Sequence, residues 1–506
     1  MTFYITTSRP YTNATPHLGT ILDPVYADVY ARFNRLLGQP VMFSMGTDEH
    51  SSKIADTASE QGIKTQDFVN TKYQEFKQVF DNLELSYDNF VQSSDNKHKW
   101  LANMAWNKLV AKNLIYKKQY QGLYCDGCED FYSASQLVND RCPVHINREI
   151  KKVEEENYFF RLTAFKDSVL DYLTKVRVND SSIINSMRNF CDDLQDISIS
   201  RDIARQKTPW GIVVASDPQH SMYVWFEALL TYLTPLIPDE LYETWIDSTP
   251  DIQKAVELEA WEIISENTPQ NLQVIGTDNS KFHLIIWPAI LQALDLEPIE
   301  SVIIHGMIND SQGRKFAKSL GNGVSFQELY DKLGVEGVRF FVLYYCNSAG
   351  DTSYDEAKLI EMYNSNLGNK LGNLVMRLTT LSSNFNDGDI DIEQAKETYE
   401  ESQDLRLSID PVYRELQALR PEYALRTWFD EVSKINKYLE DTKPWILMKD
   451  KEANSIEITK ILDTGIYGLL FLLEPLSLFL PATTQLVNNY LRCDRIVKAT
   501  PLFQKL

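Results

Sequence analysis

The sequence predicts an α/β amino-terminal part built on a parallel sheet, followed by an α-helical bundle. Residues 3–8 (FYITTS) are rich in aromatic and β-branched types, as a buried strand is, and a helical period follows over residues 17–33. A second apolar run, residues 41–45, ends in the polar segment 46–50. Strand, loop, helix and strand in this order open a parallel sheet, and its ligands are expected at the carboxyl ends of the strands.

Elements of both kinds continue to about residue 350, and helical periodicity dominates beyond that point. We expect α/β elements at residues 222–232, 272–276 and 302–308, and bundle helices at residues 367–381, 424–439 and 458–473. The acidic stretch 386–401 predicts a solvated loop and the start of a helix. The most apolar stretch, 465–480, contains Glu474 and Pro475, which favour a buried helix over a membrane span.

Charge and the amino-terminal sequence restrict the function and the location. The 506 residues include 50 Lys and Arg against 71 Asp and Glu, a net charge of −21, which argues against sequence-blind binding of nucleic acid. A polyanionic partner would have to be held by local basic and aromatic patches. The chain begins directly with a strand-like segment and has no basic or Arg-rich presequence, so we expect a cytoplasmic protein.

Three cysteines and one histidine have the spacing of a zinc site. Cys125-x-x-Cys128 is followed after 13 residues by Cys142-Pro-Val-His145. Three thiolates and one imidazole satisfy tetrahedral zinc and leave no position for a catalytic water, so we expect one structural zinc ion in a small knuckle. The alternative is a set of unrelated surface cysteines.

Two short motifs some 300 residues apart have the chemistry of a triphosphate site. His17-Leu18-Gly19-Thr20 stands at the start of a helix, where glycine lets a nucleotide approach the backbone and histidine can donate to phosphate. Lys315-Phe316-Ala317-Lys318-Ser319 follows Gly313 on a polar loop that can bring two ammonium groups to pyrophosphate. Alone, the histidine could be a capping residue and the lysines a solvated face.

Together with other motifs in the same order, these two resemble the methionyl-tRNA synthetase family of class I aminoacyl-tRNA synthetases over nearly the whole chain. The further matches are Tyr11 and Asn13, GTDEH at 46–50, GLYC at 122–125, NYFF at 157–160, SISR at 198–201, PWGI at 209–212, YVWF at 223–226, Trp287-Pro288, LGNL at 371–374 and KPW at 443–445. A dozen ordered matches are far more specific than any one of them.

The resemblance implies activation of L-methionine with ATP and Mg²⁺ to methionyl-adenylate and pyrophosphate, followed by transfer to the 3′ end of tRNA(Met). It assigns catalysis to His17, Lys315 and Lys318. It places ATP at His17, Gly19, Thr20, Asp278, His305, Gly306, Ile308, Lys315, Lys318 and Ser319. It places methionine at Ser8, Tyr11, Asp48, Trp225, Ala228, Leu229, Tyr232, Phe282 and His283, and the anticodon at Asn373, Arg377 and Trp445.

The resemblance also implies a domain order. Residues 1–115 and 201–330 would form the halves of a Rossmann-type catalytic domain, and residues 116–200 an inserted domain with the zinc knuckle. Residues 331–352 would link to a helical anticodon-binding domain, residues 353–506. No carboxy-terminal dimerisation domain follows in this sequence, so we expect a monomer.

Several residues depart from the family pattern. Thr20 replaces the second histidine of H-x-G-H, and Phe316 and Ala317 replace Met and Ser. Arg9 stands where an aliphatic residue near the methionine sulfur is usual, and either points away or makes the pocket more polar; Asn279 is also polar there, and Thr277 replaces a lysine.

Two alternatives follow. One is a synthetase for leucine, isoleucine, valine or cysteine. About 80 inserted residues leave no room for the editing domain that the first three normally carry, and cysteine enzymes use zinc in the active site with a different ligand arrangement. The other is a non-catalytic tRNA-binding relative.

Overall fold

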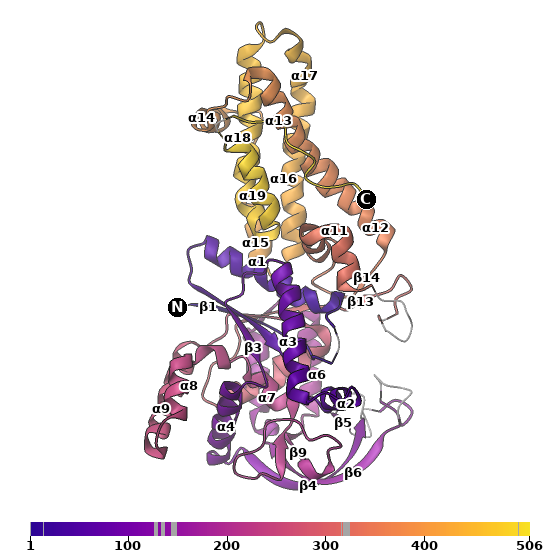
Figure 1. The fold of residues 1–506 in the computed structure, drawn as a ribbon, viewed down its shortest axis with the longest axis vertical. Helices are drawn as coiled ribbons and strands as arrows, with labels where there is room; N and C mark the ends of the chain where they lie inside the picture. Colours follow the sequence, from indigo (N-terminus) through magenta and orange to yellow (C-terminus); the bar gives the residue numbers. More distant parts are fainter. Residues whose placement is uncertain are drawn as a thin grey trace.

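The computed structural model describes residues 2–13, 15–125, 130–132, 137–142, 149–314, 316, 324–493 and 495–506. Six predicted residues of interest lie outside these ranges: Cys128, His145, Lys315, Ala317, Lys318 and Ser319. Figure 1 shows an elongated molecule, with the sheets in one half and a bundle of helices extending away from them.

A six-stranded, fully parallel sheet forms the centre of the first half, in the order β3-β2-β1-β11-β12-β7. Its strands are β1 (Phe3–Thr7), β2 (Val41–Thr47), β3 (Asn89–Gln92), β7 (Arg177–Val178), β11 (Leu272–Gly276) and β12 (Ser301–His305). The first strand pairs with β2 on one side and with β11 on the other. The chain therefore changes direction across the sheet at β1, which opens a crevice at the carboxyl ends of β1 and β11. The predicted α/β class is confirmed.

The helices of this half bury their apolar faces against the sheet or against one another. They are the short 3₁₀ turn η1 (Leu18–Ile21), α1 (Leu22–Leu36), α2 (Ser52–Glu60), α3 (Thr65–Asn82), α4 (Asn96–Ala111), α5 (Lys166–Lys175), α6 (Ser182–Asp192), α7 (Val224–Leu230), α8 (Asp239–Ile246), α9 (Pro250–Glu266), the π-helical turn η7 (Phe282–Ile286) and α10 (Trp287–Ala293). The strand predicted at 272–276 matches β11. The element predicted at 302–308 divides at Gly306 into β12 and the short β13 (Ile308–Asn309), which pairs with β14 (Thr352–Ser353).

The inserted region is a second, antiparallel sheet. Its order is β5-β4-β6-β8, from β4 (Ile115–Cys125), β5 (Asp130–Tyr132), β6 (Lys151–Phe160) and β8 (Ile197–Ser198), and β9 (Ser200–Asp202) pairs with β10 (His220–Met222). The long β4–β6 ladder lies at the end of the molecule opposite the bundle (Figure 1). The predicted inserted domain thus consists largely of paired strands.

The second half is helical, as predicted. It contains α11 (Phe326–Phe340), η9 (Phe341–Tyr345), α12 (Glu356–Tyr363), η10 (Asn364–Gly372), α13 (Asn373–Asn386), α14 (Ile392–Glu401), α15 (Asp410–Gln417), α16 (Pro421–Thr442), α17 (Pro444–Leu447), α18 (Ser455–Phe479) and α19 (Pro481–Leu491). By length and composition α18 could cross a membrane, but 78% of its most apolar window is buried inside the protein. It is the central helix of the bundle (Figure 1).

The two halves share one apolar core, which runs from β1 and α1 through α11 to α16 and α18. Polar contacts reinforce it: the Tyr26 and Tyr30 hydroxyls on α1 donate to the carbonyls of Val342 and Leu416. The fully buried Arg339 of α11 donates to the Asp28 carboxylate on α1 at 2.8 Å and to the Phe479 carbonyl at the end of α18 at 2.8 Å. Helix α1 begins directly after the η1 turn, which contains residues 18–20 of the first predicted phosphate motif, and it also forms the surface on which the bundle packs.

Candidate active site

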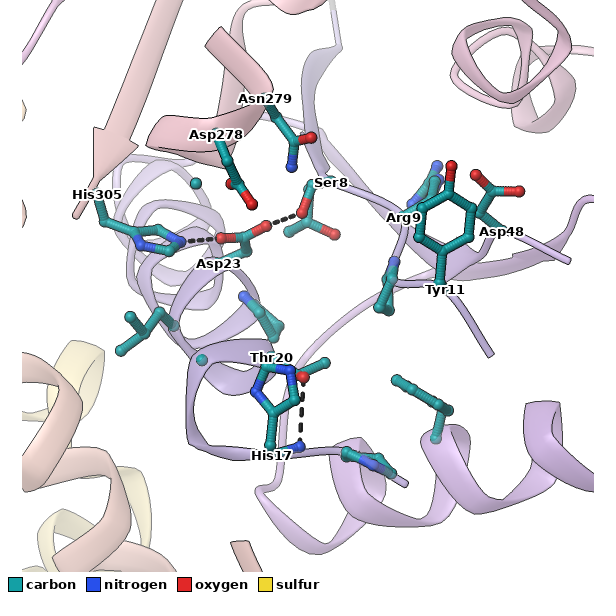
Figure 2. A pocket seen from close by; sticks show the side chains of 18 of the residues that line it. Ser8, Arg9, Tyr11, His17, Thr20, Asp23, Asp48, Asp278, Asn279 and His305 are labelled. Carbon is teal, nitrogen blue, oxygen red and sulfur yellow. Dashed lines mark hydrogen bonds and ion pairs between the residues drawn. The ribbon is translucent and has the colours of Figure 1, made fainter. Parts of the chain in front are cut away.

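One cavity of about 710 Å³ opens at the carboxyl ends of four neighbouring strands. Ser8 to Tyr11 follow β1, Asp48 follows β2, Asp278 follows β11, and His305 ends β12. Parallel strands bring these segments to one edge of the sheet, which is why residues almost 300 positions apart line the same space. Figure 2 shows two groups: Arg9, Tyr11 and Asp48 on one side, and Asp23, Asp278 and His305 on the other.

The first group is fixed by the loop between β1 and α1. Tyr11 and Asp48 form a parallel bridge, in which the Asp48 N–H donates to the Pro10 carbonyl at 3.0 Å and the Thr12 N–H donates to the Asp48 carbonyl at 3.3 Å. Only 3% of Asp48 is exposed. This end of the cavity therefore offers a carboxylate in a low-dielectric setting, which suits a substrate ammonium group.

Aromatic side chains line the space beside Asp48. The Trp225 and Phe282 rings stack with centroids 3.8 Å apart, and Tyr11 meets Trp225 edge-on at 5.9 Å. Phe282 and His283 open the π-helical turn η7, whose wider turn brings both to the cavity. Ala228 and Leu229 of α7 complete an apolar pocket suited to a thioether side chain.

Tyr232 and His283 form a buried hydrogen bond whose direction the geometry defines. The His283 Nδ1 lies 2.9 Å from the Asn279 carbonyl and so carries the proton, while its Nε2 lies 2.8 Å from the Tyr232 hydroxyl. Burial lowers the pKa of His283 to about 4, against the opposing effects of Asn279 and Asp23, so the ring is neutral. The Tyr232 hydroxyl therefore donates to His283 and keeps only lone pairs for other groups.

A second buried network lies close in sequence to Asp48 and involves Glu227, His50 and His98. The Glu227 carboxylate on α7 lies 3.2 Å from His50 Nδ1 and 3.1 Å from His98 Nε2. Burial lowers the pKa of His50 to about 3 and raises the pKa of Glu227, although the hydrogen bond from His98 opposes the latter shift. The network ties the segment after β2 to α7, so it fixes the distance between the carboxylate and the aromatic pocket.

The second group begins at the first turn of the helix. The His17 backbone N–H donates to the Thr20 hydroxyl at 3.3 Å, so Thr20 holds the turn and retains its own O–H as a donor. A Cβ at position 19 would lie 3.0 Å from the His17 ring, so a larger residue there would require that ring to shift. His17 also forms an antiparallel bridge with Ser325, and Ser325 and Phe316 line the same cavity as His17. Of the second predicted phosphate motif, only Phe316 lies within the described residues.

Asp23 lies at the centre of the second group, and the sequence prediction did not include it. Its carboxylate accepts from the Ser8 hydroxyl and from His305 Nε2, as the dashed lines in Figure 2 show. His305 Nδ1 donates to the Gly306 carbonyl at 2.8 Å, so both ring nitrogens face acceptors. Burial acts to lower the pKa of His305, but the charge and hydrogen bond of Asp23 outweigh it and raise the pKa.

Close backbone packing shapes the same end. A Cβ on Gly306 would lie 2.1 Å from the Gly350 carbonyl, so only glycine fits there. Asp278 and Ile308 line the cavity on either side of it. Every described residue predicted for methionine or ATP lines this cavity: Ser8, Tyr11, His17, Gly19, Thr20, Asp48, Trp225, Ala228, Leu229, Tyr232, Asp278, Phe282, His283, His305, Gly306 and Ile308.

The other predicted residues lie elsewhere. Cys125 and Cys142 are fully buried in the inserted region, and Cys128 and His145 lie outside the described residues. At the far end of the bundle, the Arg377 guanidinium lies 5.7 Å from the Trp445 ring and 2.8 Å from the Glu440 carboxylate. Arg377 stands one turn after Asn373 on α13, so the bundle also brings its predicted group together.

The parallel sheet with its strand-end cavity, and the helix-start histidine bridged to the segment after the lysine loop, define a class I aminoacyl-tRNA synthetase. The family model for "tRNA synthetases class I (M)" matches residues 3–153 and 135–379. The methionine–tRNA ligase of Caldanaerobacter subterraneus subsp. tengcongensis is 35% identical over 490 residues, which cover 95% of this chain and 72% of the relative. The corresponding ligase of Synechocystis sp. is 33% identical over 467 residues, 90% of this chain and 83% of the relative.

A solved structure of Mycobacterium tuberculosis methionyl-tRNA synthetase in complex with methionyl-adenylate is similar over 97% of this chain and 94% of that one, with a TM-score of 0.83 and 29% identity. The chain belongs to the methionine–tRNA ligase family. Its activity is that of a class I methionine–tRNA ligase, which answers the alternative of a synthetase for another amino acid.

Proposed function

We propose that the cavity holds methionine at its Asp48 side and ATP at its His305 side. The single observation that carries this placement is the continuity of the cavity, since one space is lined by both groups of residues. Asp48 would bind the methionine ammonium, and Tyr11, Trp225 and Phe282 would surround the side chain. The methionine carboxylate would then attack the α-phosphorus as pyrophosphate leaves.

In this proposal, catalysis consists of positioning and charge stabilisation. His17 at the start of η1 would donate to the phosphates, aided by the Thr20 hydroxyl. Lys315 and Lys318 would approach from the segment before Ser325 and stabilise the leaving pyrophosphate, as would Mg²⁺ bound with ATP. Asp278, Gly306 and Ile308 would hold the nucleoside. Transfer of methionine to the 3′ end of tRNA(Met) follows in the cytoplasm.

Two regions away from the cavity complete the proposal. Cys125, Cys128, Cys142 and His145 would hold one structural zinc ion, and the complete burial of Cys125 and Cys142 suits a closed thiolate site. The ion would supply folding energy to the inserted domain, and takes no part in the reaction.

The exposed Trp445, paired with Arg377 and close in sequence to the end of α16, offers a stacking surface for anticodon bases, and Asn373 adds hydrogen bonds. We propose that residues 353–506 bind the anticodon in this way while residues 331–352 connect them to the catalytic domain.

Amino-acid-dependent pyrophosphate exchange with each of the twenty amino acids tests the placement of methionine. We expect a signal with methionine and a rise in the methionine KM of at least about tenfold in Asp48→Asn, because a hydrogen bond to a charged group contributes about 1.5–3 kcal/mol. Asp171→Asn, an exposed aspartate of α5, is the matched control and should leave the KM unchanged. An unchanged methionine KM in Asp48→Asn would remove Asp48 from the site.

A further inference from the structure

Arg9 is a buried cation at the amino-acid side of the cavity. It is 9% exposed, lines the cavity, and lies beside Asp48 and Tyr11 in Figure 2. Its guanidinium lies 5.0 Å from the centre of the ring of Tyr232, which also lines the cavity. A guanidinium remains charged even where burial lowers its pKa, as it does here.

The protein satisfies only part of this group. Arg9 Nε donates to the Thr231 hydroxyl at 3.4 Å, and its two terminal nitrogens donate to the Ser44 carbonyl and hydroxyl at 3.1 Å each. These three acceptors are neutral, and a guanidinium has five N–H groups. Within the described part of the chain, two N–H groups therefore remain without an acceptor, in a place where an unmatched polar group is costly.

The two polar side chains nearest to the Arg9 end of the pocket, Tyr232 and His283, already use their protons within the protein. The Tyr232 proton is committed to His283, and the His283 Nδ1 proton is committed to Asn279. Of these three side chains, Arg9 is thus the one with N–H groups left to donate to a substrate side chain.

We propose that Arg9 determines side-chain specificity by donating a hydrogen bond to the substrate, so that the enzyme activates amino acids of methionine's length that carry an acceptor at the sulfur position, methionine sulfoxide among them. This proposal rests on the placement of methionine proposed above. A thioether sulfur is a weak acceptor, whereas a sulfoxide oxygen is a strong one, and a norleucine methylene is none.

The chemistry of activation is the same for each substrate. A carboxylate oxygen forms a bond to the α-phosphorus, the bond from that phosphorus to the pyrophosphate oxygen breaks, and pyrophosphate leaves with the electron pair. The sulfoxide group is neither reduced nor oxidised in this step, so no further reactant is needed.

The test compares pyrophosphate exchange by the full chain with L-methionine, L-methionine sulfoxide freed of methionine, and L-norleucine, with mass detection of the adenylate. We expect the sulfoxide to exceed norleucine in kcat/KM by about tenfold or more, the range that a charge-assisted hydrogen bond gives. In Arg9→Leu this ratio should fall about tenfold, and Arg9→Lys should recover part of it. Arg426→Leu is the matched control, since Arg426 also donates to a carbonyl (Tyr344) and lies near an aromatic ring, but in the bundle; its ratio should equal that of the wild type.

Each result has one meaning. If the wild type uses methionine but favours norleucine over the sulfoxide, or if Arg9→Leu keeps the wild-type ratio, Arg9 is only a structural link between β1, β2 and α7 and the proposal is overturned. The wild-type ratio decides by itself if Arg9→Leu does not fold. Absence of exchange with methionine would instead overturn the proposed activation site, which separates the two failures.

Discussion

The buried Arg339 joins three helices, and its contacts allow the effect of removing it to be worked out. Arg339→Met keeps most of the apolar stem but loses a charge-assisted bond to Asp28, about 1.5–3 kcal/mol, and leaves the Phe479 carbonyl without its 2.8 Å donor, about 1–3 kcal/mol. Asp28 keeps Arg32 and Ser86 as partners, so it is not left bare. The expected loss is about 3–5 kcal/mol of unfolding free energy, as for other broken buried ion pairs.

Urea denaturation, followed by tryptophan fluorescence and circular dichroism, measures this loss. The control is Lys175→Met, which removes an exposed ion pair to Asp171 and should change the unfolding free energy by less than about 1 kcal/mol. A loss in Arg339→Met no larger than that of the control would refute the reasoning.

The same pair gives a pH signature. Burial acts to raise the pKa of Asp28, but Arg339 and Arg32 outweigh it and hold the pKa below its ordinary 3.8. A depressed carboxylate pKa stabilises the fold above the unfolded value, and this stability is lost as the pH falls through the folded one. The difference between wild type and Arg339→Met should therefore narrow below about pH 4.

Three further predictions concern the site and the inserted region. Gly306→Ala should abolish ATP-dependent exchange and lower the melting temperature, because the new Cβ would lie 2.1 Å from a backbone carbonyl. The control is Gly368→Ala, where a Cβ would meet open space, and equal behaviour of the two variants would contradict the packing argument. Because Asp23 raises the pKa of His305, Asp23→Asn should move the inflection that His305 gives in the pH profile of the ATP KM to lower pH. The stability that charged His305 contributes is present at low pH and is lost as the pH rises through the folded pKa of His305. An inflection at the wild-type pH in Asp23→Asn would show that the two residues are not paired. Cys125→Ser should remove stoichiometric zinc, measured by atomic emission, and loosen the inserted sheet to proteolysis, whereas zinc retained at one equivalent would speak against the proposed ligand set.

The sequence predicted the strands and the cavity well because both depend on local pattern. The strand at 272–276 and the residues following each strand end are read from apolar runs that stop at polar or glycine residues. Asp23 was missed because an acidic residue in the first turn of a helix is explained by the helix dipole alone, and its partner His305 lies 282 residues away.

Two aromatic residues of the cavity wall were missed for a related reason. Phe76 and Phe80 of α3 line the cavity, yet two phenylalanines four apart on a helix ordinarily indicate core packing, and both are only 2% exposed. The π-helical turn η7 has no simple sequence signal either, because its wider turn depends on how the chain packs after β11. The direction of the Tyr232 hydrogen bond could likewise be determined only from the structure. The proposed role of Arg9 as a donor depends on that direction.

The shared core from β1 to α18 bears on how such a protein can be divided or recombined. A cut between α11 and α12 would expose the apolar face of α1 around Tyr26 and Tyr30, together with the buried Arg339, so a truncated amino-terminal fragment should aggregate rather than serve as a miniature enzyme. The same holds for exchanging the carboxy-terminal helices with those of a relative. A chimera would therefore also need the matching face of α1. Because α1 begins at the active site, the boundary between exchangeable parts lies within this helix and not between the two halves of the chain.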